Sequence, residues 1–348
     1  MPIPTTNERA SQFACVVVPS PEHNLPSHPE NVGRFALLEP ALREIAGVRM
    51  LQPQPGPVEA AAISHVHPRA YLDALQSACA DGPGYLDADT YVTPGSYDAA
   101  LMAAGGTLKV LEAVMSGEAS SGFALVRPPG HHASATVPMG FCLLNNVAIA
   151  ARHAQARGLD RIMIVDFDVH HGNGTQAIFI EDPSVLYVST HQWGIYPGSG
   201  ALGETGEGDG VGTTVNIPLP AHSGDKTFAA IADEILRPLS RRFNPDLLLV
   251  SAGFDGHWRD PLAQFGLTSA GYYYLSTVLH SIGQDQCGGK ALFVLEGGYE
   301  PLALAAGVRA VCHALLGLPQ AEDPLGPSAY VEPDFKPLLE RVKTVHRL

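Results

Sequence analysis

The chain is short of basic residues. Its 21 lysines and arginines are outnumbered by 35 aspartates and glutamates, which gives a formal net charge of −14. A protein that binds nucleic acid over a broad face needs a concentrated positive field. The composition therefore argues against nucleic-acid binding and favours a cationic or neutral ligand.

Cysteine and long apolar runs are also scarce. The five cysteines are an odd number without CxxC spacing, which disfavours a disulfide framework or a thiolate zinc knot and predicts a reducing compartment. No run of about 18 apolar residues occurs, and the N-terminus lacks the basic and apolar regions of a signal peptide. We expect a soluble, cytoplasmic protein with no membrane partner.

Hydrophobic residues are plentiful at 45%, against 16% charged residues, as in a compact, well-buried protein. No repeat, charge block or low-complexity linker divides the 348 residues. We predict a single domain over 1–348, with a core at about 14–316 and a proline-rich tail at about 317–348. The glycine-rich stretch 197–214 is expected to form a long surface loop.

Short apolar runs that end in polar residues predict six buried strands, at 14–20, 122–132, 161–171, 185–191, 246–255 and 290–299. Helical segments lie between them, after Tyr97, from Asn146 and from Thr227. This alternation predicts an α/β fold with a parallel sheet covered by helices on both faces.

Ligands of open parallel sheets bind outside the carboxyl ends of the strands, so residues that close several strands can meet there. In this chain those residues are His131, His132, Asp168, His170, Asp255 and Tyr299.

Three of these residues could hold a metal ion. Asp168 and His170 stand two apart at a strand end and face the same side, and Asp255 closes another strand. Two carboxylates and one imidazole leave positions open for water, which suits a catalytic zinc ion or a similar divalent ion such as iron. From spacing alone, a strand terminus with helix-capping acids is an equal interpretation.

His131 and His132 follow the turn LVRPPG, which can present two adjacent imidazoles. Such a pair suits taking and returning a proton during hydrolysis, with Asp166 and Asn173 available to orient the rings. Tyr299, in the loop EGGYE, can donate a phenolic hydrogen bond to an oxyanion. By itself, however, a loop tyrosine is more often simply exposed.

Six motifs appear in a recognisable order: HPEN at 28–31, RPPGHHA at 127–133, GFCLLNNVAIAA at 140–151, DFDVHHGNGTQ at 166–176, SAGFDGH at 251–257 and LEGGY at 295–299. Together they resemble the histone deacetylase family, more closely its class II and bacterial members, over roughly residues 14–316. The resemblance implies the arginase/deacetylase-type three-layer fold, with a narrow acyl-lysine channel and zinc at its floor.

The resemblance also implies residue roles. It makes Asp168, His170 and Asp255 the zinc ligands, His132 the general base and acid, His131 its electrostatic partner with Asp166 behind it, Asn173 the neutral partner of His132, and Tyr299 the residue that polarises the amide carbonyl. Class I members carry aspartate at the position of Asn173.

The channel is implied in the same way. Phe141 and Tyr196 match its aromatic walls, with Gly140 at its side, although core packing would explain the two rings equally well. Leu262 stands at the mouth where polyamine-deacetylating relatives usually carry glutamate. Asp89 matches the rim, or is a solvated loop acid.

Three further sites are implied by the resemblance. Arg34 matches an arginine of an internal acetate-exit cavity, or is a buried ion-pair partner. A potassium site is implied at the main-chain oxygens of Asp166, Asp168 and His170 with the Ser189 hydroxyl and the neighbouring Thr190. A second potassium site falls around Phe179 and Val185.

The sequence thus predicts a zinc-dependent amidohydrolase acting on acetylated lysine peptides or small acetylated amines. The apolar Leu262 weakens the case for acetylpolyamines, because it offers nothing to a second positive charge. An arginase-like hydrolase with two manganese ions would need more Asp and His ligands, and a catalytically silent acyl-lysine-binding module would not need the tandem histidines. The oligomeric state, a homo-oligomer included, is open.

Overall fold

The computed structural model describes residues 13–52, 58 and 60–348. Residues 1–12, on which the prediction about a signal peptide rests, lie outside them. Eight parallel strands form the central sheet in the order β2-β1-β5-β10-β9-β6-β7-β8. They are β1 (Phe13–Val18), β2 (Val48–Met50), β5 (Ser121–Val126), β6 (Ile162–Asp166), β7 (Val185–Gln192), β8 (Thr214–Leu219), β9 (Leu247–Ala252) and β10 (Ala291–Leu295).

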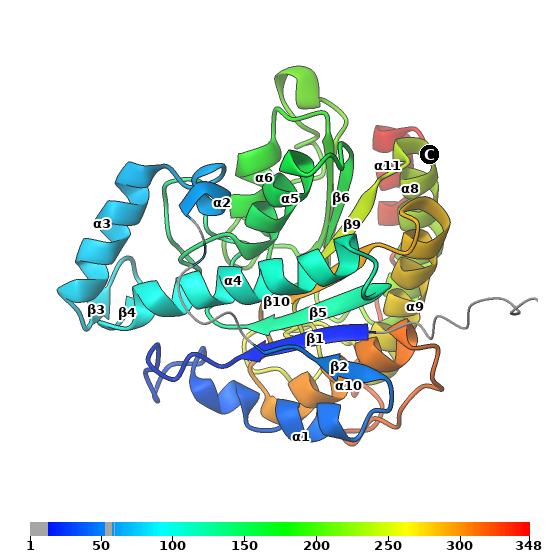
Figure 1. The fold of residues 1–348 in the computed structure, drawn as a ribbon. Helices are drawn as coiled ribbons and strands as arrows, with labels where there is room; N and C mark the ends of the chain where they lie inside the picture. Colours follow the sequence, from blue (N-terminus) through cyan, green and yellow to red (C-terminus); the bar gives the residue numbers. More distant parts are fainter. Residues whose placement is uncertain (1–12, 53–57, 59) are drawn as a thin grey trace, which may run out of the picture.

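Helices cover both faces of this sheet (Figure 1). One face carries α3 (Arg69–Ala80), α4 (Ser96–Met115) and α5 (Asn146–Ala156), with the short α2 (Ala60–Ser64) and α6 (Asn173–Phe179) nearby. The other carries α1 (Leu38–Arg43), α7 (Asp225–Ile231), α8 (Arg237–Phe243), α9 (Ser269–Gln286), α10 (Pro301–Leu315) and α11 (Lys336–His346). The predicted α/β three-layer class is confirmed.

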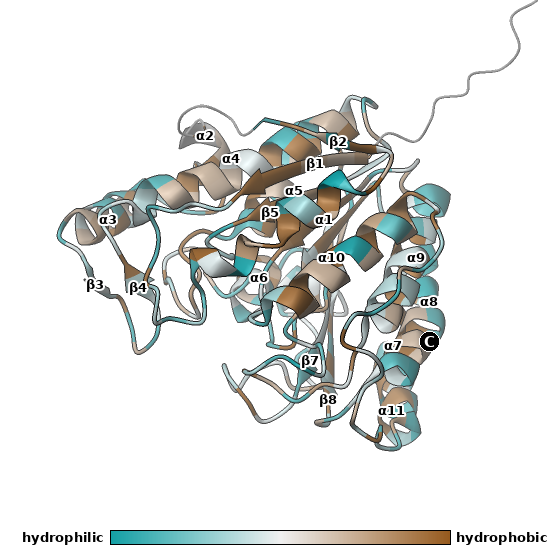
Figure 2. Cartoon of the chain, turned by 90° about the horizontal axis from the view of Figure 1, so that it is seen from below, coloured by the Kyte–Doolittle hydropathy of each residue, from teal (hydrophilic) through white to brown (hydrophobic). Residues whose placement is uncertain are grey.

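The core consists of two apolar layers, one on each side of the sheet. In β1, Cys15 and Val17 pack into one layer while Ala14 and Val16 pack into the other, because successive side chains of a strand point to opposite faces. Every residue of β5 is buried. Figure 2 shows the brown strands inside and teal residues on the outer sides of the helices. Continuous apolar runs are therefore required in the strands, and these are the runs that the sequence displays.

The structure adds elements that the sequence analysis did not predict. The edge strands β2 and β8 pair with β1 and β7, and β3 (Gly84–Tyr85) pairs antiparallel with β4 (Tyr91–Val92). β8 reads TVNIPL, and its asparagine and proline hide it from an apolar-run criterion. The segment with α3 and the β3–β4 pair projects beyond the sheet at the left of Figure 1.

The predicted surface loop at 197–214 contains one 3-10 turn, Gly208–Gly210, and leads into β8. In the tail, α11 packs Leu339 and Val342 into the core, and the Glu332 carboxylate accepts a hydrogen bond from Thr227 N of α7. The division into one domain with a core and a tail stays a prediction. Among the described residues, no helix is both long and apolar enough to cross a bilayer.

Candidate active site

Two carboxylates and an imidazole meet at the carboxyl ends of β6 and β9. Ligand atoms of Asp168, His170 and Asp255 all lie within 4.8 Å of one another. The main chain fixes the carboxylates: Gly297 N donates to Asp168 Oδ2 at 2.8 Å, and Val169 N donates to Asp255 Oδ1 at 3.1 Å. The three residues predicted as metal ligands are thus brought together, as expected for neighbouring parallel strands.

This group suits a divalent cation. Asp255 Oδ2 is buried and accepts no hydrogen bond within the described residues, and it lies 3.3 Å from His170 Nδ1. Burial, together with the nearby charge of Asp168, raises the pKa of Asp255. Two carboxylates that share a dry site are costly unless a cation compensates them. Zinc in catalytic sites takes three protein ligands of these types and leaves positions open for water and substrate.

His131 is held in its charged form. Its Nδ1 donates to Asp166 Oδ2 at 3.0 Å, and Asp166 also accepts from the Tyr187 hydroxyl at 3.0 Å. Burial lowers the pKa of His131, but the charges of Asp166 and Asp168 outweigh burial and raise this pKa to about 10. The neighbouring carboxylates therefore favour the protonated form of this imidazole.

His132 is the opposite case. Its Nδ1 lies 2.7 Å from Asn173 Oδ1; an amide oxygen only accepts, so Nδ1 carries the proton and Nε2 keeps its lone pair. Burial and the charge of His131 hold its pKa well below the usual range. Two adjacent histidines are thus separated into a cation and a neutral base, an arrangement typical of acid–base sites.

A cavity of about 220 Å³ leads to these residues, and all five residues predicted for the channel line it. Its lining consists of Asp89, Pro129, His131, His132, Gly140, Phe141, His170, Tyr196, Leu262, Gly297 and Tyr299. Tyr196 and Leu262 are 38% and 37% exposed, whereas His132 is only 4% exposed. The cavity therefore opens at Tyr196 and Leu262, which form its mouth with the predicted rim residue Asp89, and has its floor at His132.

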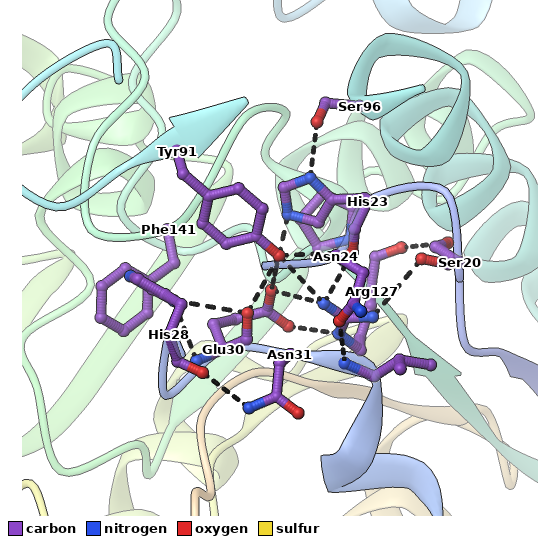
Figure 3. Close-up of polar contacts among 12 residues, drawn as sticks. Ser20, His23, Asn24, His28, Glu30, Asn31, Tyr91, Ser96, Arg127 and Phe141 are labelled. Carbon is purple, nitrogen blue, oxygen red and sulfur yellow. Dashed lines mark hydrogen bonds and ion pairs between the residues drawn. The ribbon is translucent and has the colours of Figure 1, made fainter. Parts of the chain in front are cut away.

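His28 packs against Phe141, which forms one wall of the cavity (Figure 3). The ring of His28 meets that of Phe141 edge-on, with 4.6 Å between centroids, and His28 Nε2 donates to the Asp89 carbonyl oxygen at 3.0 Å. Thr90 Oγ1 accepts from Phe141 N at 3.1 Å, which helps to hold Phe141 at its unusual φ of 69°. The predicted rim residue Asp89 and wall residue Phe141 are thus tied together.

Tyr299 lies at the floor. It follows Gly297 and Gly298 after β10 and directly precedes Glu300, whose side chain caps α10 by accepting from Ala303 N. Its ring meets that of Phe141 edge-on at 5.8 Å. Burial raises the pKa of the phenol, so the hydroxyl keeps its proton and can donate.

Arg34 lies beneath the Tyr299 ring, with its guanidinium carbon 4.8 Å from the ring centroid. It donates to the carbonyl oxygens of Glu296 and Gly298 at 2.6 and 2.7 Å, and to Glu30 Oε1 at 3.0 Å. The predicted residue is therefore a buried ion-pair partner that also holds the loop before Tyr299. Its place in an acetate-exit cavity stays a prediction.

Glu30 is the centre of this network and was not predicted. It is fully buried, and both Arg34 and Arg127 donate hydrogen bonds to its carboxylate. The Arg127 Nη2 atom lies 2.8 Å from Glu30 Oε2, and Tyr91 and His23 also contact the carboxylate (Figure 3). The two guanidinium groups keep the pKa of Glu30 well below its usual range in spite of burial. The HPEN and RPPGHH motifs are thus joined through one carboxylate.

Glu296 is a second residue that the sequence analysis missed. Its Oε2 accepts from the main-chain nitrogens of Gly130 and His131 at 2.7 and 3.1 Å, and its Oε1 accepts from Ser251 Oγ at 2.9 Å. It therefore fastens the tandem-histidine turn to β9 and β10. Its place in the strand-end motif LEGGY was the available signal.

Of the residues proposed for the first potassium site, Asp166, Asp168, Ser189 and Thr190 are buried and His170 is partly exposed. Thr190 Oγ1 donates to the Asp166 carbonyl oxygen at 3.3 Å, and Ser189 Oγ lies 2.9 Å from His191 Nδ1. Both hydroxyls are thus partnered by protein atoms. The potassium sites, including the one near Phe179 and Val185, stay predictions.

Comparisons with known proteins agree with this geometry. A family model described as "Histone deacetylase domain" matches residues 28–315. The chain is 41% identical to "Histone deacetylase 14, chloroplastic" of Arabidopsis thaliana, over 94% of this chain and 82% of that protein. It is 38% identical to "Histone deacetylase-like amidohydrolase" of Pseudomonas aeruginosa, over 75% and 69% of the two chains. The crystal structure of the HDA15 HD domain superposes with a TM-score of 0.85 at 34% identity, over 96% of both chains.

Proposed function

Because the chain belongs to the histone deacetylase family, we propose that it is a zinc-dependent amidohydrolase that removes acetyl or other short acyl groups from acyl-lysine or related acylated amines. The observation that carries this proposal is the meeting of the Asp168, His170 and Asp255 ligand atoms next to one cavity, which His170 and a neutral His132 line. Asp168, His170 and Asp255 would hold the zinc ion. When bound, zinc supplies a Lewis acid that activates water and polarises the substrate carbonyl.

His132 is the general base and acid of the proposed reaction. Its Nε2 lone pair is available because Nδ1 donates to Asn173. It takes a proton from the attacking water and delivers it to the departing amine. His131, kept positive by Asp166, prevents His132 from holding that proton too tightly.

Tyr299 stabilises the developing negative charge. Its hydroxyl remains protonated at neutral pH and donates to the carbonyl oxygen as that oxygen becomes an oxyanion. Loss of one such donor costs on the order of 10²–10³ in turnover. Phe141 and Tyr196 would enclose the alkyl chain that leads to the amide.

We propose acetylated lysine peptides or small acetylated amines as substrates. The exposed Leu262 gives an ammonium group at the mouth no favourable charge, which supports acyl-lysine over acetylpolyamines. The acidic net charge of −14 would attract lysine-rich peptides at long range.

Potassium as a second cofactor and a cytoplasmic location belong to the same proposal. The five cysteines are free and buried, which supports a reducing compartment. Iron is the alternative to zinc for this ligand set.

The test is hydrolysis of a fluorogenic acetyl-lysine peptide and of acetylated polyamines by metal-stripped and zinc-restored protein, with Tyr299→Phe as the control. We expect zinc-dependent turnover that falls on the order of 10²–10³-fold in the variant. Turnover that needs no metal, or that is as fast in Tyr299→Phe as in the wild type, would contradict the mechanism. No turnover on any substrate would favour a binding module.

A further inference from the structure

Asp260 occupies the loop between β9 and α9 and is only 7% exposed. Its carboxylate accepts two main-chain hydrogen bonds from different parts of the chain. Tyr299 N donates to Oδ2 at 2.7 Å, and Leu262 N donates to Oδ1 at 3.0 Å. Its own nitrogen donates to the His257 carbonyl oxygen at 2.8 Å, so the main chain that carries the carboxylate is itself held in place.

The two donors belong to opposite ends of the cavity. Tyr299 lies at the floor, where its hydroxyl is the proposed oxyanion donor, and Leu262 lies at the mouth and is 37% exposed. Asp260 contacts both through their main-chain nitrogens and leaves their side chains free for the substrate. One carboxylate therefore fixes the floor relative to the mouth.

The main chain at Tyr299 needs such an anchor. Tyr299 follows two glycines, and Gly298 has a φ of 118°, which glycine adopts more readily than other residues. Because glycine has no side chain, neither residue can hold this loop by side-chain contacts. Arg34 holds this loop through the Glu296 and Gly298 carbonyl oxygens. Asp260 holds the next peptide nitrogen, so the position of Tyr299 Cα is set from two directions.

We propose that Asp260 is a positioning residue that places the Tyr299 hydroxyl for catalysis and couples its position to the channel mouth at Leu262. This inference rests on the proposed deacetylase function. Donors to a developing oxyanion must be held within about 0.5 Å of the productive position, so a small shift of the Tyr299 main chain is enough to lower turnover.

The test is a double-mutant cycle with Asp260→Asn and Tyr299→Phe. Asparagine keeps the size of the side chain but places an NH2 donor where one carboxylate oxygen now accepts, so the hydrogen bond to that oxygen is lost. We expect Asp260→Asn alone to lower kcat for an acetyl-lysine peptide on the order of 10- to 100-fold, with little change in KM. In the Tyr299→Phe background, the same substitution should change kcat by less than about twofold, because no hydroxyl is left to position.

Asp225→Asn is the matched control. Asp225 accepts from Thr268 N and Thr268 Oγ1 outside the cavity, and its replacement should leave kcat unchanged. If Asp260→Asn does not fold, Asp260→Ser, which keeps one acceptor in a smaller side chain, takes its place in the cycle.

The outcomes separate the two levels of inference. Losses that multiply in the double variant, with an active wild type, would overturn the positioning role alone. A wild type without turnover on any acylated amine would overturn the proposed function and this inference with it. Loss from Asp260→Asn that disappears in the Tyr299→Phe background supports the proposal.

Discussion

Asn173→Asp should move the pH dependence of catalysis toward higher pH. The substitution places a carboxylate where Asn173 Oδ1 now lies, 2.7 Å from His132 Nδ1. At an effective dielectric constant of about 20, opposite charges about 4 Å apart attract by about 4 kcal/mol, which is roughly three pKa units. The wild-type pKa of His132 is held low by burial and by the charge of His131, so the variant should raise it part of the way back.

The sign follows from which form the new charge stabilises. A carboxylate stabilises the protonated imidazole, so the pKa of His132 rises and the unprotonated base is reached only at higher pH. The acid limb of kcat/KM should therefore move upward by about one to three pH units. Above that limb, the variant should regain most of its activity, because the hydrogen bond to Nδ1 is kept.

The assay is kcat/KM for an acetyl-lysine peptide between about pH 5 and 9. Asn244→Asp is the control: it makes the same chemical change at the exposed residue that ends α8, and its profile should match the wild type. An acid limb that does not move in Asn173→Asp would refute the assignment of His132 as the base that Asn173 orients.

Two further predictions concern metal binding and stability. Gly297→Ala would place a Cβ 1.9 Å from Asp255 Oδ2 and 2.7 Å from Asp168 Oδ2, so the zinc affinity measured by chelator competition should fall on the order of 10- to 100-fold. Gly203→Ala, whose Cβ would have no atom within 4 Å, is the control. An unchanged zinc affinity in Gly297→Ala would contradict the ligand set. His67 is buried, and burial lowers its pKa from 6.5 to about 4. Because the unfolded chain binds more protons between these values, this group's contribution to stability is complete above about pH 6.5 and declines as the pH falls toward 4. Between pH 7 and 5 the wild type should lose about 2 kcal/mol more unfolding free energy in urea than His67→Gln, and equal losses would exclude this effect.

The sequence predicted the layers of the fold and the residues at the strand ends, because burial on both faces requires apolar runs and polar residues interrupt them where the strands stop. The same logic brought Asp168, His170 and Asp255 together. It could not find β8, whose composition is mixed, nor the strand order, which depends on crossovers between distant segments.

The missed residues share one property: their partners are far away in the sequence. Asp260 and Glu296 look like ordinary loop acids until the fold brings main-chain donors to them. Glu30 stands in the HPEN motif, yet only the structure places Arg127 and Arg34 around it. Local patterns identify side chains of types suited to catalysis, whereas residues that hold others in place depend on tertiary contacts.

The mouth and the floor of the cavity belong to different kinds of structural element. The floor rests on strand ends packed into the core, whereas Tyr196, Leu262 and Asp89 come from loops outside the sheet. Mutations at the mouth can change which molecules enter without disturbing the packing that keeps the protein folded. After gene duplication, a few substitutions in these loops would therefore be enough to give one copy of this protein a new substrate while the reaction at the floor stayed the same.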